Sequence, residues 1–250
     1  MTRLLLCGCG GKMGAAVQNF VRQREDCQIV AGVDLAGMPQ EGFPVYTGIA
    51  EVCEPIDVII DFSHPSALPS ILDYGKAHPG AAAVLCTTGY TPEQTAVIHE
   101  AAKTMPLFYS RNMSLGVNLL IELSKKAARV LGTDFDVEIL EMHHNQKIDA
   151  PSGTALMLAD AINEERENAM KYVYDRHSQR KKREKGEIGL HSVRGGTIVG
   201  EHQVIFSGQQ EVITLSHSAQ SKELFASGAI NAAVFMQGKG PGLYSMPDLL

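Results

Sequence analysis

Cysteine is scarce in this chain of 250 residues. There are five, none forms a CxxC pair, and all lie in the first third of the sequence: Cys7, Cys9, Cys27, Cys53 and Cys86. An odd number at such spacings is typical of reduced thiols and argues against a disulfide framework or a zinc knuckle. Because no cysteine follows Cys86, the later part of the chain also lacks the nucleophilic thiol that an aldehyde-type dehydrogenase needs.

Long apolar runs are absent as well. No window approaches the roughly 18 uninterrupted apolar residues at which a membrane span is expected. The apolar run at residues 4–7 is too short for the core of a signal peptide, and glycines follow it at once. We therefore expect a cytoplasmic protein that does not engage a membrane.

An excess of positive charge is missing too. The formal net charge is −6, from 22 Lys and Arg against 28 Asp and Glu, which argues against nucleic acid as the main partner. One basic run occurs at residues 180–183, but Glu184 and Glu187 follow it and it contains no aromatic side chain to stack on bases. We interpret this run as a solvated face of a loop or helix.

Short apolar runs alternate with helical stretches over residues 1 to about 112. Strands are expected at residues 4–6, 29–33, 58–60, 83–85 and 107–109. Helices are expected at residues 15–24, 67–77 and 92–103, the last with Thr91 as its N-cap and Pro92 in its first turn. This alternation predicts an α/β fold with a Rossmann-like, doubly wound parallel sheet.

After residue 112 the pattern changes. Residues 115–131 form one long amphipathic helical pattern, residues 135–142 alternate like a strand, and residues 152–165 are helical. From residue 189 the chain alternates with a period of two, the texture of antiparallel strands, before residues 224–236 return to a helix. We predict a second α+β domain with a mixed sheet at 115–221. It is inserted into a dinucleotide-binding domain made of 1–114 and 222–250.

A glycine-rich segment joins the first predicted strand to the first predicted helix. It reads Gly8, Cys9, Gly10, Gly11, Lys12, Met13, Gly14. Glycines permit a tight turn close to a pyrophosphate, and a helix N-terminus presents N–H groups to it. The strict fingerprint has Met13 where its third glycine belongs. Asp34, at the end of the second strand, is placed to bind the ribose of an adenosine. A plain tight turn and a strand-end cap remain alternatives for the two features.

Two polar segments follow later strands at the same edge of the predicted sheet. They consist of Cys86, Thr87 and Thr88, and of Ser110, Arg111, Asn112 and Met113. Ligands of an open parallel sheet bind outside the carboxyl ends of its strands. We therefore expect these residues to hold the nicotinamide end of a dinucleotide.

Residues 141–155 combine two histidines, a lysine and a helix start. His143 can exchange a proton near neutral pH, and Lys147 is a point charge for an anion. Gly153 and Thr154 lie in the first turn of the helix, with N–H groups that suit a carboxylate. Together these features predict a site for an acidic small molecule.

Other interpretations of this segment stay open. The paired histidines could be solvated, or they could join Asp149 around a metal. No helical HxxxH pattern supports a metal, however, and Lys147 would repel a cation, so we predict none. Three further histidines stand alone on strand-like stretches and are expected to be structural or to lie behind the site residues: His191, His202 and His217.

These motifs resemble those of the 4-hydroxy-tetrahydrodipicolinate reductase family, also called dihydrodipicolinate reductases. Beyond the glycine loop, the resemblance includes Asp61-Phe62-Ser63, Thr87-Thr88-Gly89, Asn118, the run HHxxKxDAPSGTA at residues 143–155, Arg194-Gly195-Gly196 leading to Gly200-Glu201-His202, and Pro241-Gly242-Leu243-Tyr244. It extends from end to end, and the HHxxKxDAPSGTA run is its most specific part.

The resemblance implies a function. It implies the reduction of a small dicarboxylate, 4-hydroxy-tetrahydrodipicolinate, to tetrahydrodipicolinate in diaminopimelate and lysine biosynthesis. The hydride comes from NADH or NADPH, and the assembly is usually a homotetramer. By the same resemblance His143 is the general acid, Lys147 binds and polarises the substrate, and His144, Gly153 and Thr154 hold its carboxylates. A regulator that binds NADH without chemistry is the alternative from another class, but it has no need for His143 beside Lys147.

Three positions depart from the pattern. Many relatives have phenylalanine where Met113 stands and arginine where Lys222 stands. Some carry a basic residue for the 2′-phosphate of NADPH where this chain has Leu35. Lys12 is then the remaining nearby candidate for that contact.

Overall fold

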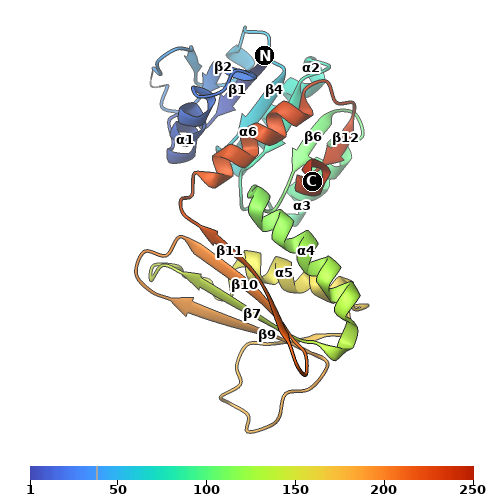
Figure 1. Ribbon diagram of the computed structural model, residues 1–250. Helices are drawn as coiled ribbons and strands as arrows, with labels where there is room; N and C mark the ends of the chain where they lie inside the picture. The colour runs from blue at the N-terminus through green and yellow to red at the C-terminus, as the bar shows by residue number, and fades with distance from the viewer. Residues whose placement is uncertain (38) are drawn as a thin grey trace. The chain divides into compact units, whose positions relative to one another are not determined.

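The computed structural model describes residues 1–37 and 39–250. The chain divides into two compact units, one made of Met1–Ser114 and Glu223–Leu250, the other of Leu115–Lys222. In Figure 1 the blue and cyan segments and the red C-terminal helix belong to the first unit. Within the described ranges, no helix is both long enough and apolar enough to cross a membrane.

The first unit is built around a sheet of seven parallel strands in the order β12-β6-β5-β4-β1-β2-β3. The strands are β1 (Thr2–Cys7), β2 (Cys27–Val33), β3 (Val45–Tyr46), β4 (Val58–Asp61), β5 (Ala82–Leu85), β6 (Pro106–Tyr109) and β12 (Gly242–Tyr244). The direction of winding changes between β1 and β4, the switch point at which sheets of this kind bind ligands. The sequence did not predict the short edge strands β3 and β12.

Helices cover both faces of this sheet. They are α1 (Lys12–Val21), α2 (Leu68–Ala77), α3 (Pro92–Ala101) and α6 (Leu224–Met236), with 3₁₀ turns at Ile49–Glu51, Pro65–Ala67 and Met246–Leu249. Leu4 and Leu6 pack with α1 and α6, whereas Leu5 packs with α2, because successive side chains of a strand point to opposite faces. The predicted doubly wound fold is confirmed, as is the cap of α3, where Thr91 accepts a hydrogen bond from the N–H of Gln94.

Helix α1 begins earlier than the sequence pattern predicts, at Lys12 instead of residue 15. The glycine-rich loop ends at its N-cap, Gly11, and Gly14 lies inside the first turn. Glycine is unfavourable within a helix. Here, however, a Cβ at Gly14 would collide with the carbonyl oxygens of Gly8 and Cys9. The tight approach of the loop to the helix therefore requires glycine at this position.

The second unit contains a mixed sheet of five strands in the order β11-β10-β7-β9-β8. The strands are β7 (Asp136–His143), β8 (Lys171–Val173), β9 (Glu187–Arg194), β10 (Gly200–Ser207) and β11 (Val212–Ala219). Helices α4 (Leu115–Leu131) and α5 (Gly153–Glu164) pack on one face, over a core that includes Val137, Val204 and Phe206, and a 3₁₀ turn follows α4 at Gly132–Asp134. The predicted α+β domain with a mixed sheet is confirmed, whereas β8 was not expected.

The register of β7 determines which polar side chains meet at its end. Its residues alternate between half-buried and buried, and the last two buried ones are Glu141 and His143. His143 pairs with Arg194 on the parallel neighbour β9, and Glu141 pairs with His202 on the antiparallel neighbour β10. Strand β7 therefore delivers a carboxylate and an imidazole to the packed side of the sheet.

Candidate functional site

In the first unit, glycines shape the loop that follows β1. Gly8 has a φ of 78°, and a Cβ there would lie 2.6 Å from the carbonyl oxygen of Phe62, just after β4. No side chain at the N-cap Gly11 satisfies the first N–H groups of α1. Such a loop fits the pyrophosphate of a dinucleotide, because its backbone can approach closely and the helix end favours negative charge.

Asp34 lies beside this loop at the end of β2. One carboxylate oxygen accepts the N–H of Gly10 at 2.9 Å, and the other accepts the N–H of Ala36 at 3.0 Å. The carboxylate thus caps its own turn and is also held against the glycine loop, where it can meet an adenosine ribose. Leu35 is 92% exposed, and Lys12 is exposed at the first position of α1.

A cavity of about 330 Å³ lies at the carboxyl ends of β4, β5 and β6. It brings together eight residues that the sequence predicted for the cofactor: Met13, Cys86, Thr87, Thr88, Ser110, Arg111, Asn112 and Met113. Phe62, Ser63 and Phe225 complete its walls. These three residues were not predicted to contact the cofactor, although the position of Phe62 and Ser63 directly after a strand indicates such a contact. Apolar walls with a few hydroxyl and amide groups suit a flat ring with a polar substituent.

The buried thiols at these strand ends are not nucleophiles. Burial raises the pKa of both Cys7 and Cys86 well above the ordinary thiol value, so both stay protonated. The neighbouring carboxylate of Asp61 accepts hydrogen bonds from the backbone and hydroxyl of Ser63 and from the hydroxyl of Tyr90. These contacts hold the strand ends in place. The protonated state of the two thiols argues further against a thiol-dependent dehydrogenase.

In the second unit, the imidazole of His143 lies at the end of β7 and the residue is 9% exposed. Its Nδ1 is 2.6 Å from Oε2 of Glu141. A Cβ at Gly200, the first residue of β10, would lie 3.1 Å from Nε2 of the same ring. Glycine at that position leaves room beside Nε2. The ring thus has one nitrogen engaged by a carboxylate and one that can exchange a proton with a ligand.

Glu141 is fully buried and is held from several sides. Arg194 donates to its two oxygens at 2.8 and 2.7 Å, and the backbone N–H of Ser152 donates at 3.1 Å. Burial alone would raise the pKa of this carboxyl, but hydrogen bonds from Arg194, Ser192 and His143 outweigh burial and hold the pKa at about 2. Glu141 is therefore ionised at neutral pH. Glu141 was not predicted from the sequence, although residues two apart on a strand share a face, and Glu141 is two residues before His143.

Lys147 lies in the loop after β7. Its Nζ is 2.9 Å from Oδ1 of Asp149, and this ion pair lowers the pKa of Asp149. The side chain of Asp149 is 59% exposed, and an ion pair of that kind contributes little to stability. A carboxylate ligand can therefore replace Asp149 beside Lys147. Half-buried His144 lies on the same loop, where its carbonyl accepts the N–H of Lys147 at 3.2 Å.

Helix α5 begins at Gly153, directly after this loop. Ser152 is its N-cap, and the hydroxyl of Ser152 accepts the N–H of Ala155 at 3.2 Å. A Cβ at Gly153 would meet open space. The backbone N–H groups of Gly153 and Thr154 belong to the positive end of the helix, which suits a carboxylate. The predicted substrate residues thus share one loop and the helix start that follows it.

His202, which the sequence predicted to be structural or to lie behind the site residues, lies beside His143. The ring centroids are 5.2 Å apart with an interplanar angle of 74°, and Nε2 of His202 is 2.9 Å from the hydroxyl of Ser152. Burial, and after it the proximity of His143, lowers the pKa of His202 to about 4. The ring is therefore neutral at neutral pH and links β10 to the start of α5 without adding charge. Nowhere in the described parts of the chain do three His, Cys, Asp or Glu side chains group as a metal site would require.

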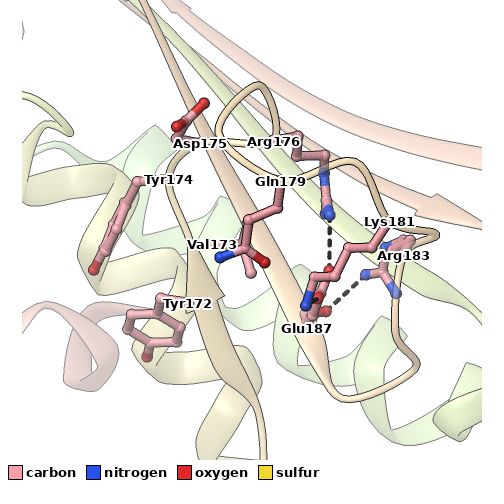
Figure 2. A pocket seen from close by; sticks show the side chains of 9 residues that line it. All are labelled: Tyr172, Val173, Tyr174, Asp175, Arg176, Gln179, Lys181, Arg183 and Glu187. Carbon is pink, nitrogen blue, oxygen red and sulfur yellow. Dashed lines mark hydrogen bonds and ion pairs between the residues drawn. The ribbon is translucent and has the colours of Figure 1, made fainter.

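The basic run is only partly the solvated face that the sequence predicted. Arg180 and Lys182 are exposed, but Arg183 is half-buried. Arg183, Lys181, Arg176 and Glu187 line a cavity of about 280 Å³. Figure 2 shows the three cations gathered around Glu187. The two arginines also pair with Glu138, at 2.9 and 2.6 Å. Since carboxylates match these cations, the cavity offers little excess charge to an anion, and we interpret the cluster as an anchor for its loop.

Known proteins resemble this chain over its whole length. Residues 2–113 match the family model for the N-terminus of dihydrodipicolinate reductase, and residues 116–250 match the model for its C-terminus. The chain is 51% identical to 4-hydroxy-tetrahydrodipicolinate reductase of Caldanaerobacter subterraneus subsp. tengcongensis, with 100% of this chain and 98% of that protein covered. It is 46% identical to the enzyme of the same name from Clostridium tetani, with 100% and 97% covered. It also resembles the solved structure of dipicolinate-bound dihydrodipicolinate reductase from Paenisporosarcina sp. TG-14, with a TM-score of 0.82, 27% identity and full coverage of both chains.

Proposed function

This chain belongs to the dihydrodipicolinate reductase family, and from that premise we propose that it reduces 4-hydroxy-tetrahydrodipicolinate to tetrahydrodipicolinate in diaminopimelate and lysine biosynthesis. NADH or NADPH, when bound, supplies a hydride from C4 of its nicotinamide, and the 4-hydroxyl group of the substrate leaves as water. The observation that carries the proposal is the segment from His143 to Thr154, in which a buried imidazole, a lysine and a helix start are neighbours.

His143 is the general acid of the proposed reaction. Because its Nδ1 is engaged with Glu141, the nitrogen that gives a proton to the substrate is Nε2. Lys147 exchanges Asp149 for a substrate carboxylate, and its charge polarises the bond that is reduced. The two catalytic residues thus act differently, His143 through proton transfer and Lys147 through electrostatic attraction.

The substrate carboxylates are held by side chains and backbone together. Lys147 and His144 supply the side chains, and Gly153 and Thr154 supply N–H groups at the start of α5. The absence of a Cβ at Gly153 opens the approach to these N–H groups. A relative in this family has been solved with dipicolinate bound, and that ligand is a flat dicarboxylate.

The first unit holds the dinucleotide in this proposal. We assign the pyrophosphate and adenosine to Gly8, Cys9, Gly10, Gly11, Lys12, Met13 and Asp34, and the nicotinamide to Cys86, Thr87, Thr88, Ser110, Arg111, Asn112 and Met113. The support is a loop in which a Cβ at Gly8 would meet the neighbouring backbone, together with the cavity at the strand ends. The second unit then binds the substrate.

A turnover assay tests the proposed function. The purified chain, NADH and freshly generated 4-hydroxy-tetrahydrodipicolinate are mixed, and the loss of NADH absorbance is followed in the near ultraviolet. We expect catalytic turnover that requires both reactants. Tight NADH binding without any turnover would instead favour a nucleotide-sensing regulator.

The cofactor preference follows from Asp34. A carboxylate at the adenosine ribose favours a free 2′-hydroxyl and repels a 2′-phosphate, and Leu35 offers no compensating charge. We expect kcat/KM for NADH at least equal to that for NADPH in steady-state kinetics. Asp34→Asn, which removes the charge at nearly constant shape, should shift the ratio toward NADPH. A tenfold preference of the unmodified chain for NADPH, about 1.4 kcal/mol, would contradict this reasoning and direct attention to Lys12.

The paired carboxylate contacts predict the order of two inhibitors. Pyridine-2,6-dicarboxylate should compete with the substrate, and pyridine-2-carboxylate should bind more weakly because one anion contact is lost. In Lys147→Ala the difference between the two inhibition constants should shrink, since one of the groups that binds the second carboxylate is gone. Inhibition constants from steady-state kinetics measure this order. Equal constants for both compounds in the unmodified chain would contradict a site built for two carboxylates.

We also propose that the second unit assembles the chain into a homotetramer. The face of its sheet that points away from α4 and α5 carries half-buried apolar side chains, among them Leu140, Met142 and Ile205. Light scattering coupled to gel filtration should give four times the mass of one chain, and a monomer would contradict the proposal. A cytoplasmic location fits the five free cysteine thiols.

A further inference from the structure

We propose that Glu141, clamped by Arg194, is a positioning residue that fixes which nitrogen of His143 carries the transferred proton. The inference rests on the proposed function, in which His143 is the general acid. It adds a role for two residues that do not bind the substrate in that proposal.

The contact between Glu141 and the imidazole determines the tautomer. An ionised carboxylate can only accept hydrogen bonds, so Nδ1 of His143, at 2.6 Å from Oε2, must carry a hydrogen. That hydrogen is present both before and after the acid gives up its proton. Only Nε2, on the side where Gly200 leaves room, changes its protonation. His143 therefore gives its proton to the substrate from one atom, Nε2.

The carboxylate of Glu141 is itself unable to turn. Oε2 is shared by His143 and Arg194, while Oε1 accepts from Arg194 and from the backbone of Ser152. The guanidinium group of Arg194 donates to both oxygens at once, which fixes the plane of the carboxylate. Its positive charge also offsets the charge of a carboxylate that is completely buried.

The same contacts connect the loop that carries Lys147 with the start of α5, the two places assigned to the substrate. Arg194 donates a further hydrogen bond to the carbonyl oxygen of Asp149 at 2.7 Å, in the loop that carries Lys147. Ser152, which donates its N–H to Glu141, is the N-cap of α5. One partly buried ion pair thus sets the orientation of the acid, of the loop that carries Lys147 and of the carboxylate-binding helix start relative to each other.

The test compares Glu141→Gln with Glu141→Asp. Glutamine keeps the shape, but its amide can donate or accept, so the tautomer of His143 is no longer fixed. We expect Glu141→Gln to lower kcat by about tenfold or more, a part of the hundredfold or more that general acids contribute. KM should stay within about twofold. Glu141→Asp retains the charge that keeps a hydrogen on Nδ1, so kcat should fall less in this variant than in Glu141→Gln.

A second readout reports the tautomer itself. Nitrogen-15 NMR of histidine-labelled protein should show His143 with hydrogen on Nδ1 at alkaline pH, and a mixture of tautomers in Glu141→Gln. Loss of the signal in His143→Gln assigns it. Should Glu141→Gln not fold, Arg194→Lys tests the same clamp, because lysine keeps the charge but cannot form the fork to both oxygens. It should lower kcat severalfold at unchanged KM.

His143→Gln separates the two hypotheses. Normal turnover in that variant would reject the assigned general acid and, with it, the proposed mechanism. Slow turnover in His143→Gln combined with unchanged kcat and tautomer in Glu141→Gln, or in Arg194→Lys where that variant replaces it, would overturn the positioning role alone.

Discussion

Replacing His143 by glutamine is expected to lower kcat by about two orders of magnitude or more, the usual scale of general acid catalysis. Glutamine can fill the space beside Gly200, but it cannot give a proton to the substrate from the position of Nε2. The affinity for NADH should stay nearly unchanged, because the residues assigned to the dinucleotide lie in the first unit and His143 lies in the second. Steady-state kinetics and a fluorescence titration with NADH measure the two quantities.

Lys147→Ala is the matched comparison for this variant. It removes a charge that binds the substrate carboxylate as well as polarising the reacting bond, so it should raise KM in addition to lowering kcat. Asp149→Asn neutralises the exposed partner of Lys147. This control should show that loss of the ion pair does not by itself cause the changes in KM and kcat. A His143→Gln enzyme that turns over normally would remove this histidine from the mechanism.

Gly14→Ala should disrupt the first unit and the binding of the dinucleotide together. An added Cβ would lie 2.6 Å from the carbonyl oxygen of Cys9 and closer still to that of Gly8. These are backbone atoms, so the loop must move away from the helix. Overpacking of this kind costs about 2 kcal/mol of folding stability. Because the same loop is assigned to the pyrophosphate, the dissociation constant for NADH should rise by at least about tenfold, or roughly 1.4 kcal/mol.

Chemical denaturation and NADH titration test this prediction. Gly11→Ala is the control for stability, since its Cβ would be 3.4 Å from its nearest neighbour, the carbonyl oxygen of Gly8, which is an ordinary contact. Its unfolding midpoint should stay close to that of the unmodified chain. A Gly14→Ala variant with unaltered stability and unaltered NADH affinity would mean that the loop and helix do not need this close approach.

The sequence predicted the fold where its signals were long and local. The amphipathic pattern of Leu115–Leu131 matches α4 at both ends, because it runs without interruption until Gly132, which has a φ of 59°. The predicted start of α1 was wrong because a glycine such as Gly14 is typical of turns, although Gly14 lies within the helix. Strands β3, β8 and β12 have two or three residues each, too few for a periodic pattern, and they exist because a neighbouring strand pairs with them.

The same distinction applies to the site. His143 and Lys147 could be recognised together because they are close in sequence and precede a helix start. The pairing of Glu141 with Arg194 spans 53 residues, and that of Ser152 with His202 spans 50. Both depend on how β9 and β10 align with β7, and no local pattern contains that register. What surrounds the acid is therefore decided by strand pairing and became visible only in three dimensions.

The discontinuous make-up of the first unit has a consequence for how the protein is synthesised. Its core beneath α6 is filled by Ala229, Ile230 and Met236, which leave the ribosome only after the whole second unit. The second unit, in contrast, is one uninterrupted segment that is complete earlier. Domains usually fold in the order of their synthesis, but here we expect the later segment to fold first. Until α6 is made, only α1 covers that face of the nascent N-terminal sheet. We expect this part of the protein to depend most on chaperones during translation.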